Sequence, residues 1–310
     1  MSNSYNIRSY QPSDNDSLMD LLKETERLSK EYYISPQALL ENMMIREDYR
    51  PEDGLFLIEK ARRIIGYINT IPELGINRTV FSCLVHPDYR RKGLGTMLVG
   101  FAINYTSKVG AKVTHTNIYE DNKIGKEFLT TLGFKFIHSF SILRLNLTKT
   151  NLQNQGQKFK IRRLKKDEEK KLTDLQNRSF DGIWGYNPNK VEDVSNLLNF
   201  PDLSHKNVIV TCDNNKLIGY CWMRASLTDT HKGFFKEFIP KIHMLGVDPD
   251  YRSQGVGEIL LIAGLKNLKN RGFDFVKLIV DDKNEQAQKL YRSQGFELLN
   301  AILWYEKAIH

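Results

Sequence analysis

Residues 85–95 read VHPDYRRKGLG, and residues 247–257 read VDPDYRSQGVG. The same offset of 162 residues relates Gly110 to Gly272, and it relates the Gly-Phe pair at residues 133–134 to the pair at 295–296. No insertion interrupts this match over a stretch of about fifty residues. The repeat indicates that the chain contains two copies of one fold.

The length and composition agree with two globular domains. The chain has 310 residues, of which 41% are hydrophobic and 26% are charged, and two domains of roughly 150 residues each are typical of this size. We assign residues 1–148 to the first domain and residues 159–310 to the second. The polar stretch at residues 149–158 is predicted to be a linker.

The composition disfavours several classes of function. The first residues are polar, and no segment approaches the roughly 18 apolar residues of a membrane span, so we expect a cytoplasmic protein without a membrane partner. The three cysteines fit no metal-ligand spacing, so no metal is expected. The net charge of +8 is spread over both halves; it mostly reflects a solvated surface and suits a polyphosphate cofactor as well as a nucleic acid, and no nucleic-acid partner is expected.

Each copy shows the same order of predicted elements. A short strand and helical segments precede two strands, and a further strand ends at the glycine motif; a helix, a strand, a helix and a final strand follow. In the second copy, residues 207–211 and 217–223 are predicted to form a hairpin, and residues 241–247 the strand that leads into the motif. The helices after the motifs are expected to end at Gly110 and Gly272. The fold class is therefore α/β.

The glycine motif has the chemistry of an anion site. Where a strand leads into a helix, several backbone N–H groups lack a helical partner, and the helix dipole adds positive charge. Glycine removes the Cβ atom that would hold a phosphate away from the backbone. The motif residues are therefore candidates for cofactor binding: Arg90, Arg91, Lys92, Gly93, Leu94, Gly95 and Thr96, and Arg252, Ser253, Gln254, Gly255, Val256, Gly257 and Glu258.

The pattern Val-x-Pro-Asp-Tyr-Arg-x-x-Gly-x-Gly, followed by an Asn-led helix and Gly-Phe, resembles the GNAT superfamily of N-acetyltransferases. The resemblance covers nearly the whole chain, twice. It implies two tandem GNAT domains, each a mixed, mostly antiparallel twisted sheet flanked by helices, with acetyl-CoA as the cofactor. The motif would hold the pyrophosphate, and the strand before it would pair with the pantetheine arm. These implications add Leu84, Val85, Leu245, Gly246, Val247 and Asn284 to the candidate cofactor residues.

In the GNAT superfamily the strand before the motif carries a bulge that opens a slot for the thioester. Gly246 is suited to such a distortion, because a glycine in a strand often marks a bulge. We therefore expect the bulge of the second copy at Gly246.

The resemblance also implies different chemistry in the two copies. In GNAT enzymes a tyrosine before the terminal Gly-Phe often protonates the departing thiolate, and Tyr291 matches it, whereas the first copy has Leu129. Many members place a glutamate base where this chain has Lys241. His243, two positions further on, matches the base of arylalkylamine N-acetyltransferases and has a suitable pKa; the first copy has Phe81 there. For both Tyr291 and His243 the alternative is a packing role.

These features predict acetyl transfer from acetyl-CoA to a primary amine, by direct attack, in the second copy. The acceptor is expected to be a small molecule. Two alternatives are a non-catalytic acyl-CoA-binding or sensing module and a protein N-terminal or lysine acetyltransferase. The tandem architecture is similar to that of mycothiol synthases, but that family carries an acid where Lys241 stands, so its acceptor is not carried over.

The second copy has also gained nine residues, most readily placed at 226–240. Phe234 and Phe235 in that segment are candidates for lining an acceptor pocket, although core packing is the alternative for each.

Overall fold

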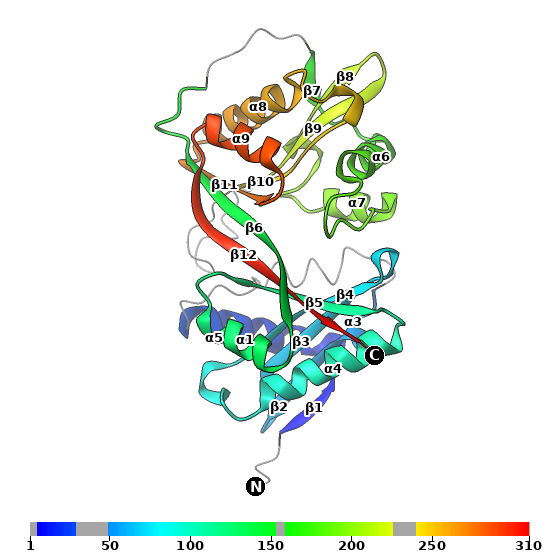
Figure 1. Cartoon of the computed structure of the whole chain (residues 1–310), viewed down its shortest axis with the longest axis vertical. Coiled ribbons are helices and arrows are strands. Elements are labelled where there is room, and N and C mark those ends of the chain that lie inside the picture. The colour runs from blue at the N-terminus through cyan, green and yellow to red at the C-terminus, as the bar shows by residue number, and fades with distance from the viewer. Residues whose placement is uncertain (1–4, 29–48, 153–158, 226–239, 310) are drawn as a thin grey trace. The chain divides into compact units, whose positions relative to one another are not determined.

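The computed structural model describes residues 5–28, 49–152, 159–225 and 240–309. Two compact units are present: unit 1 comprises Met1–His138 with Ile302–His310, and unit 2 comprises Ser139–Ala301. Each is a sheet flanked by helices (Figure 1). No helix among the described residues is long and apolar enough to cross a membrane.

The sheet of unit 1 is mixed and mostly antiparallel. Its strand order is β1 (Asn6–Ser9), β2 (Leu55–Lys60), β3 (Arg63–Glu73), β4 (Arg78–Val85), β5 (Val113–Tyr119) and β12 (Glu297–Ala308). The described neighbours are antiparallel except for the parallel pair β4 and β5. Among the described residues of unit 1 the helices are α1 (Asn15–Leu28), α3 (Pro51–Gly54), α4 (Leu94–Lys108) and α5 (Lys123–Thr131).

Unit 2 repeats this plan. Its strand order is β6 (Lys135–Asn146), β11 (Phe275–Asp281), β10 (Lys241–Val247), β9 (Lys216–Arg224), β8 (Val208–Asp213) and β7 (Ile161–Arg163), with β10 and β11 parallel. Its helices are α6 (Glu169–Phe180), α7 (Val191–Leu198), α8 (Val256–Asn270) and α9 (Glu285–Ser293). The predicted hairpin, motif strand and motif helix of the second copy are thus present. Short 3-10 turns lie at Pro12–Asp14, Leu74–Ile76, Pro87–Tyr89, His205–Asn207 and Pro249–Tyr251.

The last strand of each copy contributes to the sheet of the other copy. Residues 140–146 of β6 pair antiparallel with β11, and residues 302–308 of β12 pair antiparallel with β5 (Figure 1). The compact units therefore differ from the consecutive segments 1–148 and 159–310. A strand's alternating pattern specifies which face is buried and leaves open which sheet edge it joins, so the repeat could not reveal this exchange.

Both faces of the unit 2 sheet are covered by helices. On one face, α8 contributes Leu260, Leu261, Leu265 and Leu268 to a buried core that also holds Tyr291 and Phe296. On the other face, α6 and α7 contribute Leu172, Leu175, Val194 and Leu198 to a second core that holds Tyr220 and Trp222. The strand β10 lies between these cores: Ile242, Leu245 and Val247 contact the first, and Met244 contacts the second.

Candidate functional site

The two glycine loops have the same unusual backbone. Gly93 and Gly255 precede their helices with φ of 78° and 82°. Two residues earlier, Arg91 and Ser253 have φ of 60° and 59°, a conformation that is uncommon outside glycine. Left-handed residues in such a turn direct several backbone N–H groups to one side, which makes an anion-binding concavity at the helix N-terminus. Both loops therefore fit a pyrophosphate.

In each unit a buried side chain accepts a hydrogen bond from the backbone that leads into the glycine loop. In unit 2 the Asp248 carboxylate, 1% exposed, accepts the N–H of Asp250 and pairs with Lys216 at 3.1 Å and Arg178 at 3.2 Å. Burial alone would raise the pKa of Asp248, but the hydrogen bonds from Lys216 and the Asp250 N–H outweigh it and lower the pKa. In unit 1 the corresponding residue is His86, whose Nδ1 accepts the N–H of Asp88 at 3.3 Å.

The predicted basic residues flank the loops. Arg90 Nε donates to the Val85 carbonyl at 3.1 Å, and Arg252 Nη2 donates to the Ser179 carbonyl at 2.9 Å. Lys92 and Gln254 each donate to the backbone of the residue four positions earlier. These contacts hold the four side chains beside the exposed amides.

Three of the remaining candidates have other described roles. Glu258 accepts a hydrogen bond from Gln294 at 3.1 Å. Asn284 caps α9 by accepting the N–H of Ala287 at 3.0 Å. Thr96 lines the pocket of unit 1.

The strand before each loop separates from its parallel neighbour. In unit 1 the pairing of β4 with β5 covers Arg78 to Val80 and stops there. In unit 2 the pairing of β10 with β11 is limited to Lys241 opposite Lys277. The candidate residues Leu84, Val85, Leu245, Gly246 and Val247 thus lie on strand segments with a free edge toward the neighbour, as a pairing pantetheine arm requires.

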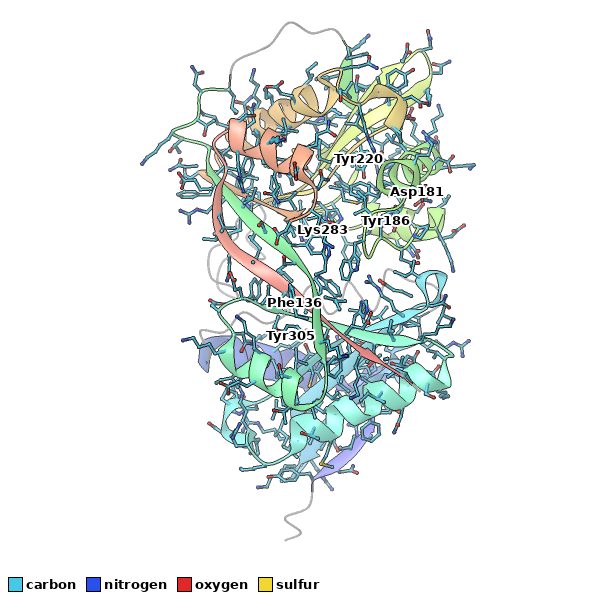
Figure 2. The ribbon with its side chains drawn as sticks, in the orientation of Figure 1. Phe136, Asp181, Tyr186, Tyr220, Lys283 and Tyr305 are labelled. Atoms are coloured by element: carbon cyan, nitrogen blue, oxygen red, sulfur yellow. The ribbon has the colours of Figure 1, made fainter. Side chains whose placement is uncertain are left out.

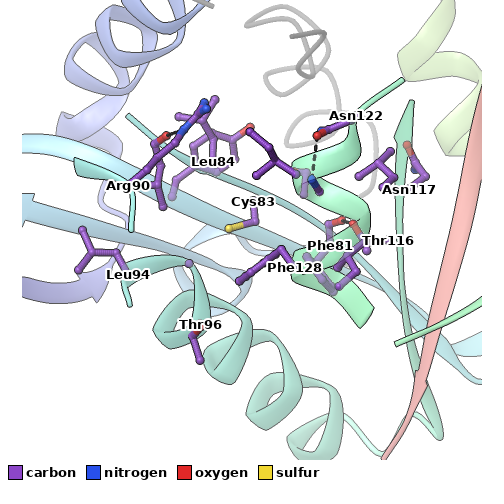
Figure 3. Close-up of a pocket in the computed structure, with 18 of the residues that line it drawn as sticks. Phe81, Cys83, Leu84, Arg90, Leu94, Thr96, Thr116, Asn117, Asn122 and Phe128 are labelled. Carbon is purple, nitrogen blue, oxygen red and sulfur yellow. Dashed lines mark hydrogen bonds between the residues drawn. The ribbon is translucent and has the colours of Figure 1, made fainter. Parts of the chain in front are cut away.

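A pocket of about 570 Å³ occupies this position in unit 1 (Figure 3). It extends from Arg90, Arg91 and the helix start at residues 93–96, along residues 81–85 of β4 and 116–119 of β5, to Asn122, Ile124, Gly125, Phe128 and Leu129 at α5. Among the described residues that line it there is no carboxylate, imidazole or lysine. Burial raises the pKa of the Cys83 thiol to about 12, so it stays protonated. The position and lining of this pocket suit a thioester arm, but its described lining includes no carboxylate, imidazole or lysine that could deprotonate an amine.

Tyr291 lies in the core of unit 2, 7% exposed, with its ring edge-on to Phe296 at 5.8 Å between centroids. Burial raises the pKa of Tyr291 well above its usual value, so the phenol keeps its proton at neutral pH. The corresponding residue of unit 1, Leu129, is 3% exposed and lines the pocket there.

His243 is the extra residue of a β-bulge. The register of β10 against β9 shifts between Ile242 and Met244. Ile242 belongs to the core beneath α8, whereas Met244 packs against the core beneath α6 and α7, although residues two apart in a regular strand point to the same face. The bulge therefore changes the face to which the following residues point.

The expectation that Gly246 would host this bulge is wrong. Gly246 pairs with Tyr220 in regular register. Position 246 has no room for a side chain, because a Cβ atom there would lie 2.4 Å from Cε1 of Tyr220 and 3.1 Å from Cβ of Ser179.

The surroundings of His243 favour its neutral form. Burial lowers the pKa of His243 well below its usual value, and the positive charges of Lys241 and Arg224 lower it further. Its ring meets Trp222 edge-on, with 5.3 Å between centroids. At neutral pH the imidazole is therefore able to accept a proton.

Sequence reasoning missed one group of residues in unit 2: Gln176, Ser179 and Tyr220, which lie on the α6 side of β10. The one available signal was the repeated triplet Ile-Gly-Tyr at residues 65–67 and 218–220. The candidates Phe234 and Phe235 lie outside the described residues.

Comparison with known families agrees with this geometry. A family model described as "Acetyltransferase (GNAT) family" matches residues 15–134 and 170–296. The chain belongs to this family. It is therefore a GNAT acyltransferase, and GNAT enzymes use acetyl-CoA, whose pyrophosphate and pantetheine arm suit the loops and the splayed strands described above.

Relatives of this chain include several proteins named mycothiol acetyltransferase. The protein of Thermobispora bispora is 26% identical over 230 residues, which cover 72% of this chain and 74% of that protein. The protein of Saccharomonospora viridis is 24% identical over 252 residues, covering 79% and 80%. The protein of Thermobifida fusca is 36% identical over 103 residues, covering 32% of this chain and 30% of that protein.

Solved structures share the tandem fold. A GCN5-related N-acetyltransferase from Sphaerobacter thermophilus superposes with a TM-score of 0.73 at 16% identity, covering 100% of this chain and 97% of that one. A tandem GNAT protein from the clavulanic acid biosynthesis pathway gives 0.73 at 13% identity and 99% coverage of both chains. At these identities the likeness shows the GNAT fold alone.

Proposed function

We propose that unit 2 transfers an acetyl group from acetyl-CoA to a primary amine, and that unit 1 binds a CoA thioester without turning it over. The observation that carries this proposal is that unit 2 holds both an imidazole at the β10 bulge, His243, and a buried phenol, Tyr291. His243 and Tyr291 are replaced in unit 1 by Phe81 and Leu129, which hold no transferable proton.

In unit 2 different groups of the chain bind the cofactor, orient it and move the protons of the proposed reaction. The amides at residues 253–257 hold the pyrophosphate, and the free edge of residues 245–247 orients the pantetheine arm. The bound thioester supplies an activated acetyl carbonyl. His243 takes a proton from the amine as it attacks this carbonyl, a role typically worth 10²–10⁴ in rate. A backbone N–H of Leu245 or Gly246 stabilises the negative charge that develops on the carbonyl oxygen.

Tyr291 completes the reaction by donating its proton to the departing sulfur. Its high pKa keeps the phenol protonated before this step. Attack is direct, so no acyl-enzyme forms on a cysteine. The burial of Cys221 raises its thiol pKa to about 12, which disfavours it as a nucleophile.

The acceptor is proposed to be a small molecule. We do not assign the acceptor of the mycothiol acetyltransferases to this chain, because it has Lys241 where the resemblance leads us to expect an acidic residue. An acyl-CoA sensor without turnover remains the second candidate, and the pocket of unit 1, which lacks any base, is the observation that favours it.

Release of free thiol from acetyl-CoA, measured with a panel of small primary amines and lysine-containing peptides, tests the proposal. Turnover with small amines supports it. Turnover with peptides alone would assign a protein acetyltransferase. Tight binding of acetyl-CoA with no turnover of any amine would favour the sensor.

A further inference from the structure

Three buried polar side chains lie near Met244 and Gly246 on the α6 side of β10. Tyr220 and Gln176 are 0% exposed, and Ser179 is 5% exposed. The point where a Cβ atom of residue 246 would stand lies 3.0 Å from Cζ of Tyr220 and 3.1 Å from Cβ of Ser179. The phenol and the serine therefore border the strand segment at which the amine is proposed to attack.

The hydrogen-bond partners of these side chains are poor. Tyr220 Oη donates to the thioether sulfur of Met244 at 3.8 Å, and Gln176 Nε2 donates to the same sulfur at 3.7 Å. Gln176 also hydrogen-bonds to Tyr220, so the sulfur is the acceptor left for the phenol proton. A thioether is a weak acceptor. Ser179 Oγ is buried and has no hydrogen-bond partner among the described residues. Buried donors in native proteins normally find good acceptors, so a cluster of exceptions requires an explanation.

A hydrogen-bond network with Asn189, Asn177 and Tyr186 fixes the orientation of the Gln176 side chain. Its Oε1 accepts a hydrogen bond from Asn189 Nδ2 at 3.0 Å. The Asn189 N–H donates to Asn177 Oδ1, which also accepts from the hydroxyl of Tyr186 at 2.8 Å. Figure 2 shows Tyr186 and Tyr220 in this part of unit 2. Because the amide oxygen is engaged, the amide nitrogen of Gln176 is left to face Met244.

Unit 1 satisfies the same positions with ordinary packing. The counterpart of Tyr220 is Tyr67, which hydrogen-bonds to Ser82, and Ser82 holds the place of Met244. The counterpart of Gly246 is Leu84, 3% exposed, whose side chain belongs to an apolar core with residues of α1. Unit 1 has unpaired buried donors of its own, Asn69 Nδ2 and Thr70 Oγ1, but the cluster of Tyr220, Gln176 and Ser179 occurs in the unit that also carries His243 and Tyr291.

The chemistry of the cluster specifies what it would bind. Burial raises the pKa of Tyr220 well above its usual value, so the phenol is a donor at any physiological pH. A phenol, a hydroxyl and a carboxamide are neutral and together favour a neutral oxygen acceptor over a carboxylate or a phosphate, for which a cation would be expected. Met244 is half-buried, and an unbranched thioether side chain moves readily to admit such a group.

We propose that Tyr220, Gln176 and Ser179 form an acceptor subsite that selects amines carrying a neutral oxygen, a hydroxyl or a carbonyl, next to the reacting nitrogen. The substrate oxygen replaces the sulfur of Met244 as the hydrogen-bond acceptor. This inference rests on the proposed function, since it deepens the description of the same site. Sites that hydrogen-bond a substrate hydroxyl discriminate strongly against analogues that lack it, because their buried donors are then left unpaired.

A matched pair of amines, trans-2-aminocyclohexanol and cyclohexylamine, tests the subsite, with kcat/KM corrected for the free-base concentration of each. The wild-type protein is expected to favour the amino alcohol by at least about tenfold, the size of one good hydrogen bond. Tyr220→Phe and Ser179→Ala are each expected to reduce this preference several-fold by raising KM for the amino alcohol. Tyr105→Phe, at a buried tyrosine of α4 outside both sites, is the matched control.

Two outcomes would overturn the subsite: equal kcat/KM for the two amines in the wild type, or an equal loss for both amines in Tyr220→Phe, which would indicate packing alone. Calorimetry of trans-2-aminocyclohexanol with the CoA-loaded protein separates this inference from the proposed function. Binding that Tyr220→Phe weakens would support the subsite even if neither amine were acetylated, and absence of binding in the wild type would contradict it.

Discussion

The Nε2 atom of His115 on β5 lies 2.8 Å from Oε2 of Glu306 on β12. On the other side of the ring, Nδ1 lies 3.2 Å from Nη1 of Arg78. A guanidinium only donates hydrogen bonds, so Nδ1 of His115 accepts from Arg78. The proton of the neutral imidazole is therefore on Nε2, which donates a hydrogen bond to the Glu306 carboxylate. The neutral imidazole thereby links the C-terminal strand to the sheet of unit 1.

This link makes the stability of unit 1 dependent on pH. Burial, with a further contribution from the charge of Arg78, lowers the pKa of His115, and Glu306 opposes the shift only in part. The unfolded chain takes up a proton near pH 6.5 while the folded chain does not, so the free energy of unfolding falls as the pH decreases below about 6.5. Urea unfolding at pH 7.5 and 5.5 measures this.

His115→Gln is the matched variant for that experiment. It is expected to cost about 1–2 kcal/mol at pH 7.5, where a buried hydrogen bond is lost, and less at pH 5.5, because protonation of the unfolded wild-type chain has already lowered its free energy of unfolding there. An equal difference between wild type and variant at both pH values would contradict the assigned role.

Replacing the phenol of Tyr291 tests the acid. Tyr291→Phe is expected to lower kcat by about 10²–10⁴, because the sulfur leaves without a proton. The ring contact with Phe296 is kept, so the Kd of CoA should be unchanged by calorimetry. Leu129→Tyr should restore no activity to unit 1, where Phe81 stands in place of the base. An unchanged kcat for Tyr291→Phe would remove the acid role.

The pH profile of kcat/KM tests His243. Because the pKa of His243 is lowered, the loss of activity attributable to its protonation is expected well below pH 6.5. Lys241→Met removes one of the two charges that lower this pKa, so the acid limb should move to higher pH. His243→Gln should reduce kcat/KM by about 10²–10⁴ and remove that limb. A limb that persists in His243→Gln would assign the base elsewhere.

A matched pair of charge insertions tests both anion loops. Gly95→Asp and Gly257→Asp each place a carboxylate in the first turn of a motif helix, a position that the helix dipole favours. The helices should therefore persist, while charge repulsion weakens CoA binding at the altered loop by at least about tenfold. Calorimetry should show two CoA sites in the wild type and a different one weakened in each variant. A single site insensitive to Gly95→Asp would make unit 1 purely architectural.

Much of the architecture was readable from the sequence, because its determinants are local. The helices after the motifs are followed by Gly110 and Gly272 with φ of 74° and 83°, a conformation that glycine adopts without steric cost. The turn between β8 and β9 contains Asn214 with φ of 51°, which asparagine tolerates. The two glycine loops have nearly the same backbone conformation because their sequences are nearly the same.

The acceptor side of β10 could not be read in this way. Gly246 suggested a bulge because a strand glycine often marks one, but its function is to leave room for Tyr220 and Ser179, which come from β9 and α6. The bulge lies at His243 instead, and the residue type at that position does not predict a bulge. Such features depend on side chains that are distant in sequence and meet only after folding.

The sequence by itself determined that the chain is two GNAT-like copies, that each copy has a helix preceded by an anion-binding loop, and that an acid and a base candidate occur in the second copy. Only the tertiary structure decided that β6 and β12 exchange sheets, that His243 stands at a bulge where Lys241 and Arg224 lower its pKa, and that Tyr220 and Ser179 lie beside Gly246. Periodicity and turn residues act over a few positions along the chain, whereas strand-edge pairing, desolvation and the meeting of distant side chains exist only in the folded protein.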